Sequence, residues 1–142
     1  MRFEGSGRLC YKLIKLFIMK KSVNLDLLKG FASLDHVVKI YVPSTVDAVR
    51  AAGDLAAVVT SDVTRELCAM FGGCTAVAGV GSWIDPDGKM ISEAVTICAS
   101  NCTLEDLNNK LPEVIALAKS VCVLMSQYCV SLEVDGHLFF IS

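Results

Sequence analysis

Two Asp-Gly pairs, each set between runs of apolar and β-branched residues, constrain the fold of this chain most. An Asp-Gly pair favours a tight reversal, because glycine readily adopts the positive φ angle that such turns need. The segment Asp85-Pro86-Asp87-Gly88 separates the apolar runs 75–84 and 90–99, and it is typical of a type I turn with a bulged glycine. Asp135-Gly136 divides the run 130–141 and is typical of a type I′ turn. The sequence therefore predicts two antiparallel hairpins.

The segment before the first hairpin combines a strand pattern with helix signals. Residues 36–42 are β-branched and aromatic, and a proline follows them, which predicts a strand. Ser44-Thr-Val-Asp47 has the spacing of a capping box, so we expect a helix over 46–60 with an interruption at Gly53-Asp54. Ser61-Asp62 is expected to cap a second helical piece over 63–71, which Gly72-Gly73 would end.

The clearest helix signal lies between the two hairpins. Thr103-Leu-Glu-Asp106 forms a capping box, and the apolar residues that follow recur at spacings of three and four. These residues are Leu107, Leu111, Val114, Ile115, Ala118, Val121, Cys122 and Met125. The pattern predicts an amphipathic helix from 103 to about 125 with one buried face.

This order of elements predicts a fold class. Strand, helix, strand, strand, helix, strand is the order of a ferredoxin-like α+β sandwich, in which both helices lie on one face of an antiparallel sheet. We expect residues 35–142 to form this single domain, with an extra C-terminal hairpin strand. Apolar residues alternate on both faces of the run 138–141, which predicts that the N-terminal arm or a second subunit covers the other face.

Charge divides the chain into two parts. Residues 1–34 carry seven basic and two acidic side chains, and residues 35–142 carry six basic and thirteen acidic ones, so the net charges are +5 and −7. We expect 1–34 to be a basic extension whose segment 8–21 forms a helix that packs on the domain or is dispensable. Contact of residues 8–21 with an anionic membrane is the less favoured alternative. Lys12 and Lys15 interrupt its apolar run, which argues against a secretory signal.

The charge of the body and the cysteines exclude several functions. An acidic body argues against nucleic-acid binding, which needs clustered basic side chains. The seven cysteines contain no CxxC pair, and the only histidines are His36 and His137, so we predict reduced thiols, no metal site and a cytoplasmic protein.

Several motifs together resemble a family of small bacterial and mobile-element proteins of unknown function. The resemblance lies in F-G-G-x-T at 71–75, G-x-W at 81–83, the turn glycine Gly88, and a closing V-x-G-x-L-x-F-I hairpin within 131–141. It covers roughly residues 35–142. Because these motifs consist of turn glycines and packing residues, the resemblance implies a fold and transfers no catalytic residue.

A search for chemistry leaves one small candidate site. The glycines at 72–81 form neither a P-loop nor a dinucleotide fingerprint, and no G-x-S-x-G is present. Asp85 and Asp87 are explained by turn formation, whereas Glu93 is an acidic residue in an otherwise apolar strand. We name Tyr41, Ser44, Trp83 and Glu93 as the candidate ligand-binding residues. We name no catalytic residue, metal ligand or cofactor.

Three function classes follow, in order of preference. The first is a non-catalytic binding module that acts through protein–protein contact and self-associates through the open sheet face or an edge strand. The second is a phage or mobile-element inhibitor whose acidic surface occupies a host nuclease or defence complex. The third is a small enzyme that combines Glu93 with a histidine. The sequence thus favours, without deciding it, a protein that is not an enzyme.

Overall fold

The computed structural model describes residues 23–46 and 50–142. The chain divides into two compact units, Met1–Ala32 and Ser33–Ser142. The described part of the first unit contains one short 3-10 helix, η1 (Leu25–Leu28), whose first turn is capped by the Asn24 side chain. The predicted helix over 8–21 lies outside the described residues.

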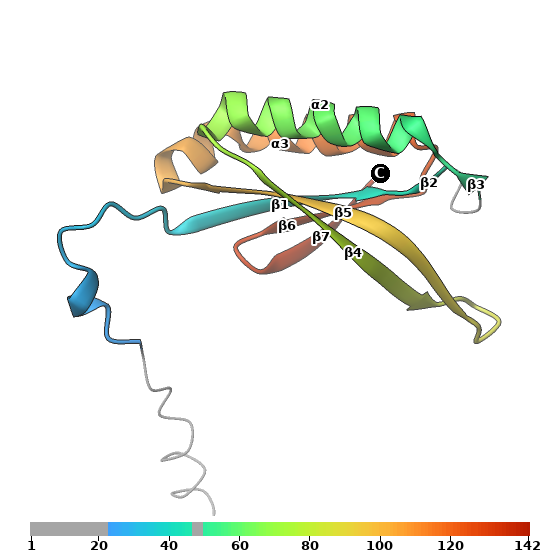
Figure 1. Cartoon of the computed structure of the whole chain (residues 1–142), viewed down its shortest axis with the longest axis horizontal. Coiled ribbons are helices and arrows are strands. Elements are labelled where there is room, and N and C mark those ends of the chain that lie inside the picture. The colour runs from blue at the N-terminus through green and yellow to red at the C-terminus, as the bar shows by residue number, and fades with distance from the viewer. Residues whose placement is uncertain (1–22, 47–49) are drawn as a thin grey trace, which may run out of the picture. The chain divides into compact units, whose positions relative to one another are not determined.

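The second unit is a five-stranded antiparallel sheet with two helices (Figure 1). Its strands are β1 (His36–Pro43), β4 (Thr75–Ile84), β5 (Met90–Cys102), β6 (Val130–Val134) and β7 (His137–Ile141). They lie in the order β4-β5-β1-β6-β7. Two short strands, β2 (Thr45–Val46) and β3 (Arg50–Ala51), pair with each other beside it.

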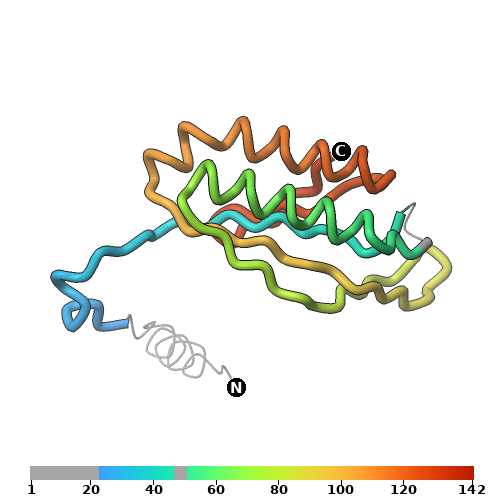
Figure 2. Tube along the Cα trace, turned by 45° about the horizontal axis from the view of Figure 1, so that its top comes forward, coloured from blue at the N-terminus to red at the C-terminus, as the bar shows by residue number. Residues whose placement is uncertain are grey.

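Both helices lie on the same face of this sheet (Figures 1 and 2). The helix α2 (Asp54–Phe71) connects β1 to β4, and α3 (Leu104–Leu124) connects β5 to β6. Each connection crosses one strand, because β5 lies between β1 and β4 while β1 lies between β5 and β6. These two interleaved crossovers, with β7 as an added edge strand, confirm the predicted ferredoxin-like α+β class.

The core fills the layer between the helices and the sheet. In β1, Val38, Ile40 and Val42 are buried, and the intervening residues face the other way. The remaining buried apolar residues come from both helices, the C-cap of α3, β5 and β6: Val59, Val63, Leu67, Cys98, Cys102, Leu107, Val114, Ala118, Val121, Cys122, Met125, Val130 and Leu132. The predicted face of α3 thus supplies a large share of this core.

Both predicted turns and the predicted cap at Thr103 are present. Gly88 has φ +81°, and the Asp85 carboxylate accepts hydrogen bonds from the Asp87 and Lys89 amides at 3.0 and 2.8 Å. Asp135 and Gly136 have φ +50° and +80°, as a type I′ turn requires. Thr103 caps α3 by accepting from the Asp106 amide at 3.1 Å.

The first helix differs from the prediction in two ways. The segment after β1 does not start a helix at Ser44: its backbone pairs instead, with the Ser44 amide bonded to the Ala94 carbonyl at 3.1 Å and the Ala52 amide to the Ser44 carbonyl at 2.7 Å. The helix begins after Gly53 and runs through positions 61 and 62 without a break. Val59, Val63 and Leu67 form one buried face, and this tertiary contact outweighs the capping tendency of Ser61-Asp62. Asp47, the last residue of the predicted box, lies outside the described residues.

Candidate functional site

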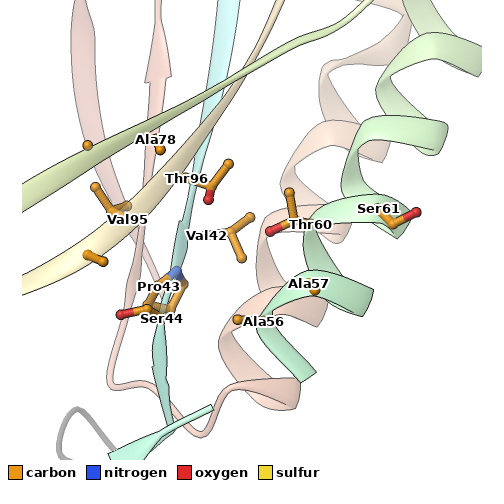
Figure 3. Close-up of a pocket in the computed structure, with 12 residues that line it drawn as sticks. Val42, Pro43, Ser44, Ala56, Ala57, Thr60, Ser61, Ala78, Val95 and Thr96 are labelled. Atoms are coloured by element: carbon orange, nitrogen blue, oxygen red, sulfur yellow. The ribbon is translucent and has the colours of Figure 1, made fainter. Parts of the chain in front are cut away.

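A cavity of about 490 Å³ lies between the first half of α2 and the strands β1, β4 and β5 (Figure 3). Its lining combines small apolar residues with hydroxyl-bearing ones: Val42, Pro43, Ser44, Ala56, Ala57, Thr60, Ser61, Ala78, Gly79, Ala94, Val95 and Thr96. None of these described lining residues has an ionisable side chain.

The small side chains explain why the helix and the sheet do not close over this space. Ala78 of β4 pairs with Thr96 of β5, and both are presented toward α2. On the helix, Ala56 and Ala57 occupy the facing turn. Figure 3 shows the Thr60 side chain directed toward the strands and the Ser61 side chain directed away from them. The alanine-rich segment that follows β1 therefore leaves a cavity where longer side chains would have packed.

The structure divides the four predicted site residues between the two faces of the sheet. Ser44 lines the cavity. Tyr41 pairs in register with Ile97, Glu93 with Gly81 and Trp83 with Ile91, and strand alternation puts these side chains on the face without helices. Glu93 and Trp83 are diagonal neighbours there, whereas Tyr41 belongs to a separate group. The sequence interpretation placed all four in one site because it could not assign strand faces between segments.

Glu93 is held by residues that the sequence analysis did not single out. The Thr45 hydroxyl donates to the Glu93 carboxylate at 2.5 Å. The Gln127 side-chain amide in turn donates to the Thr45 carbonyl at 2.8 Å and to the Met125 carbonyl at 3.0 Å. The end of α3 thus fixes β2, and β2 fixes the carboxylate next to the cavity wall. No local pattern connects these three positions, which are far apart in sequence.

A second polar group lies in the middle of the helix-free face. The Glu133 carboxylate accepts from Lys39 Nζ at 2.8 Å and from the Tyr41 hydroxyl at 2.8 Å. The hydrogen bonds from Lys39 and then Tyr41 lower the pKa of Glu133, and the bond to Glu133 raises the pKa of Lys39. The pKa of Tyr41 is raised mainly by burial and then by its hydrogen bond to Glu133. This group keeps Tyr41 engaged with Glu133 rather than with Glu93.

The histidine and carboxylate of the predicted enzyme alternative lie at opposite ends of β1. His36 Nδ1 is 2.6 Å from an Asp135 carboxylate oxygen, and the other Asp135 oxygen accepts from the Val37 amide at 2.9 Å. Glu93 bonds Thr45, beyond the other end of the strand. Nine residues of extended chain span about 30 Å, so His36 cannot act together with Glu93 on one small molecule. His137 starts β7, beside Asp135.

The described cysteines are free thiols: Cys68, Cys74, Cys98, Cys102, Cys122 and Cys129. Burial raises the pKa of the Cys74, Cys98 and Cys102 thiols, which makes them poor nucleophiles. Within residues 23–46 and 50–142, no group of three or more His, Cys, Asp or Glu side chains is placed to hold a metal ion. In the same ranges, no helix has the length and apolar character to span a bilayer.

No protein-family model matches the chain, and no curated protein matches it. Solved structures do match it. A phage SAM lyase in complex with S-methyl-5′-thioadenosine is 17% identical with a TM-score of 0.56, and the match covers 78% of this chain and 92% of the lyase. The same kind of lyase in the apo state matches with a TM-score of 0.48 at 17% identity, over 75% of this chain and 88% of the other.

A Bacillus cereus protein related to NIF3 is 10% identical, with a TM-score of 0.44 over 70% of this chain and 24% of that protein. The likeness to the ligand-bound lyase shows a shared fold, and it extends over almost the whole lyase chain.

Proposed function

We propose that this chain binds an uncharged nucleoside thioether of the S-methyl-5′-thioadenosine class in the cavity beneath α2. The observation that carries this proposal is the cavity itself, about 490 Å³ in volume and lined by alanines, valines and hydroxyl groups. Its size falls within the range of about 300–1,000 Å³ that is usual for small-molecule sites. The lyase with the same fold was solved with S-methyl-5′-thioadenosine bound, which supports this ligand class.

The chemistry of the lining selects among adenosine derivatives. Apolar walls suit the faces of a purine ring and a methylthio group, because both lose contact with water on binding. The hydroxyls of Ser44, Thr60 and Thr96 are available to the ribose and to the polar edge of the base. No lysine or arginine is among the lining residues. A nucleotide phosphate would therefore be left without a partner, and we expect discrimination against it.

Calorimetric titration of the full chain with S-methyl-5′-thioadenosine tests this proposal, with adenosine monophosphate as the charged comparison ligand. We expect saturable binding of the thioether and binding of the nucleotide that is at least about tenfold weaker. Ala78→Leu should abolish thioether binding by filling the cavity. Ala116→Leu, the same change at an exposed position of α3, should leave it intact. Equal binding by both variants, or none by the wild type, would contradict the proposal.

Turnover of the sulfonium parent, S-adenosyl-L-methionine, is a second candidate function. It is favoured by the fold shared with the lyase and by Glu93, which directly precedes the cavity residue Ala94 but whose carboxylate, fixed by Thr45, lies on the opposite face of the sheet. The negative charge of Glu93 would attract the sulfonium cation across the sheet without contact. The carbon–sulfur bond would break with its electron pair leaving on sulfur, while a carboxylate oxygen of the substrate bonds to the same carbon, which gives S-methyl-5′-thioadenosine and a lactone.

Chromatographic detection of released S-methyl-5′-thioadenosine measures this turnover. Glu93→Gln should reduce the rate by about twofold through the lost long-range charge, whereas Glu66→Gln on the exposed side of α2 should not change it. Binding without release by the wild-type chain would leave the first proposal standing and reject this one.

The predicted alternative of a phage or mobile-element inhibitor is supported by the phage origin of the lyase that shares this fold. The acidic body, with a net charge of −7 over residues 35–142, would attract a basic protein surface. Capture of a host nuclease that weakens steeply with added salt would support this function. Capture that is insensitive to salt would argue against an electrostatic contact.

A further inference from the structure

We propose that β4 pairs, antiparallel and about a two-fold axis, with β4 of a second copy of this chain. The pairing would join two five-stranded sheets into one continuous sheet. The argument for it does not use ligand binding, although Ala78 and Gly79 of β4 also line the cavity. Of the two predicted routes to self-association, it selects the edge strand rather than the open face.

The first argument is the free backbone of β4. The strand lies at one end of the sheet order and, among residues 23–46 and 50–142, pairs only with β5. Within this described part, one side of its ten-residue backbone has no strand beside it (Figure 1). Its register with β5 runs from Thr75 to Ile84 without an interruption. Eight of its ten residues are exposed. A long, regular edge of this kind is a template for another strand.

The second argument is that β4 lacks the features that usually protect an edge. Natural edge strands carry lysines, prolines or bulges, or they are very short. The sequence of β4, TAVAGVGSWI, has no charged residue and no proline. The opposite edge, β7, has half this length, with five residues. The two edges of the sheet are therefore not equivalent, and β4 is the one open to extension.

The third argument selects a second copy as the partner. A domain with a net charge of −7 repels its own copies over most of its surface, and β4 is a long exposed strip on which no charge opposes their approach. The strand is also self-complementary. With Val80 on the two-fold axis, Val77 of one copy is opposite Trp83 of the other on the helix-free face. Ala76 is then opposite Ile84 on the other face, so each contact combines residues of unlike size.

Exposed apolar surface at the same strand supports this arrangement. Val80 is 74% exposed, Ile84 is 64% exposed and Val77 is 54% exposed. Side chains of this type lose contact with water when a second sheet edge is placed beside them. The pairing would also give the outer half of the β4–β5 hairpin a third strand, and a two-stranded ribbon alone is marginal in water.

Sedimentation velocity over a concentration series tests the proposal on the full chain. The wild type should be a dimer at about 10–100 μM. Val80→Lys places two like charges at the axis and should raise the dimer dissociation constant at least about tenfold. Val58→Lys is the matched control, because Val58 is 55% exposed but belongs to α2 and not to the edge strand β4. It should leave the dimer unchanged.

Two further measurements make the outcome decisive. Circular dichroism of Val80→Lys should show the wild-type spectrum. If the variant does not fold, amide hydrogen exchange of the wild type is used in place of the variant's sedimentation, and the β4 amides should gain protection as the protein concentration rises. Phe140→Lys tests the helix-free face, since Phe140 is 68% exposed. A monomeric wild type, a dimer broken by Phe140→Lys but not by Val80→Lys, or β4 amides whose exchange does not depend on concentration would overturn the proposal.

Discussion

The two ends of the strand β5 lie in opposite environments. At its C-terminal end, Cys98, Ser100 and Cys102 are buried between the sheet and the helices. At its N-terminal end, Met90, Ser92 and Ala94 have the same alternation and the same helix-facing side, yet all three are exposed. The two ends differ in their neighbours. The C-terminal end pairs with β1 and packs under α2, whereas, among the described strands, the N-terminal end pairs only with β4 and forms the hairpin (Figure 1).

This difference shows that an apolar pattern on a strand does not by itself specify burial. The covered end of the sheet provides stability, because its side chains are packed on all sides. The hairpin end leaves its side chains and one backbone edge available for contacts. The candidate cavity lies where the first environment changes into the second. The predictions below test whether the two regions differ in energy as they do in burial.

The largest expected difference is between two isoleucines. Ile40 is fully buried in β1, whereas Ile84 is 64% exposed near the end of the hairpin. Ile40→Ala should lower the free energy of unfolding by about 2–5 kcal/mol through lost burial and a residual cavity. Ile84→Ala should change it by less than about 1 kcal/mol. Urea denaturation of both variants measures the difference, and similar losses would show that the hairpin end is part of the core.

A second comparison uses glycines. Gly136 has φ +80° in the last turn, so Gly136→Val should destabilise the protein by about 1–2 kcal/mol, because a β-branched residue is strained in this conformation. Gly81 in the hairpin is not in the positive-φ region, and a Cβ added there would meet no atom within 4 Å. Gly81→Ala should therefore be neutral or slightly stabilising. Thermal denaturation distinguishes the two, and an unchanged melting temperature for Gly136→Val would refute the type I′ turn.

A third and smaller effect concerns pH. The pKa of Glu133 is lower in the folded protein than in the unfolded chain, chiefly because Lys39 and then Tyr41 donate to its carboxylate. The contribution of Glu133 to stability is therefore complete above its pKa in the unfolded chain, about 4.3, and is lost as the pH falls through its lower pKa in the folded protein. Glu133→Gln should reduce the loss of stability on acidification, measured as melting temperature between pH 7 and pH 3.

The control for this experiment is Glu66→Gln, because Glu66 is exposed on α2 and its contact with Arg65 is long, at 3.9 Å. It should retain the wild-type pH profile. Asp135, whose pKa is lowered first by the hydrogen bond from His36, contributes in the same direction. The Glu133→Gln profile should therefore still decline in acid. A profile identical to that of the wild type would show that the Glu133 group does not stabilise the fold.

The smallest expected effect is that of deleting residues 1–18. In the part of the chain that the structure describes, every buried core residue lies between Val38 and Leu132. The shortened chain should therefore stay folded, with a melting temperature close to that of the full chain. Size-exclusion chromatography and thermal denaturation measure this. Aggregation of the shortened chain would show that the predicted basic extension takes part in the core.

The fold class could be predicted largely because its signals are local. Asp135-Gly136 and Asp85–Gly88 specify reversals through their own backbone preferences. Thr103 begins α3 by accepting a hydrogen bond from the amide of Asp106, three residues later. The failure at Ser44 has the opposite cause. Its capping tendency competes with pairing to Ala94, a partner fifty residues away, and no local pattern reports that partner.

The candidate site was less predictable, because it depends on which strand faces meet. Ser44 and Glu93 could be named from residue type alone, but their separation onto different faces follows from the register of β1, β4 and β5. Thr45, Gln127 and Glu133 were missed since each acquires its role from a residue more than forty positions away.

By itself, the sequence determined the order of strands and helices, the turns between them and the apolar face of α3, because these depend on backbone preference and on contacts within a few residues. Only the tertiary structure decided which strand became the unprotected edge, where the alanines of α2 left a cavity and which carboxylates gained partners. Those features depend on long-range pairing, which assembles side chains that no periodic pattern in the chain connects.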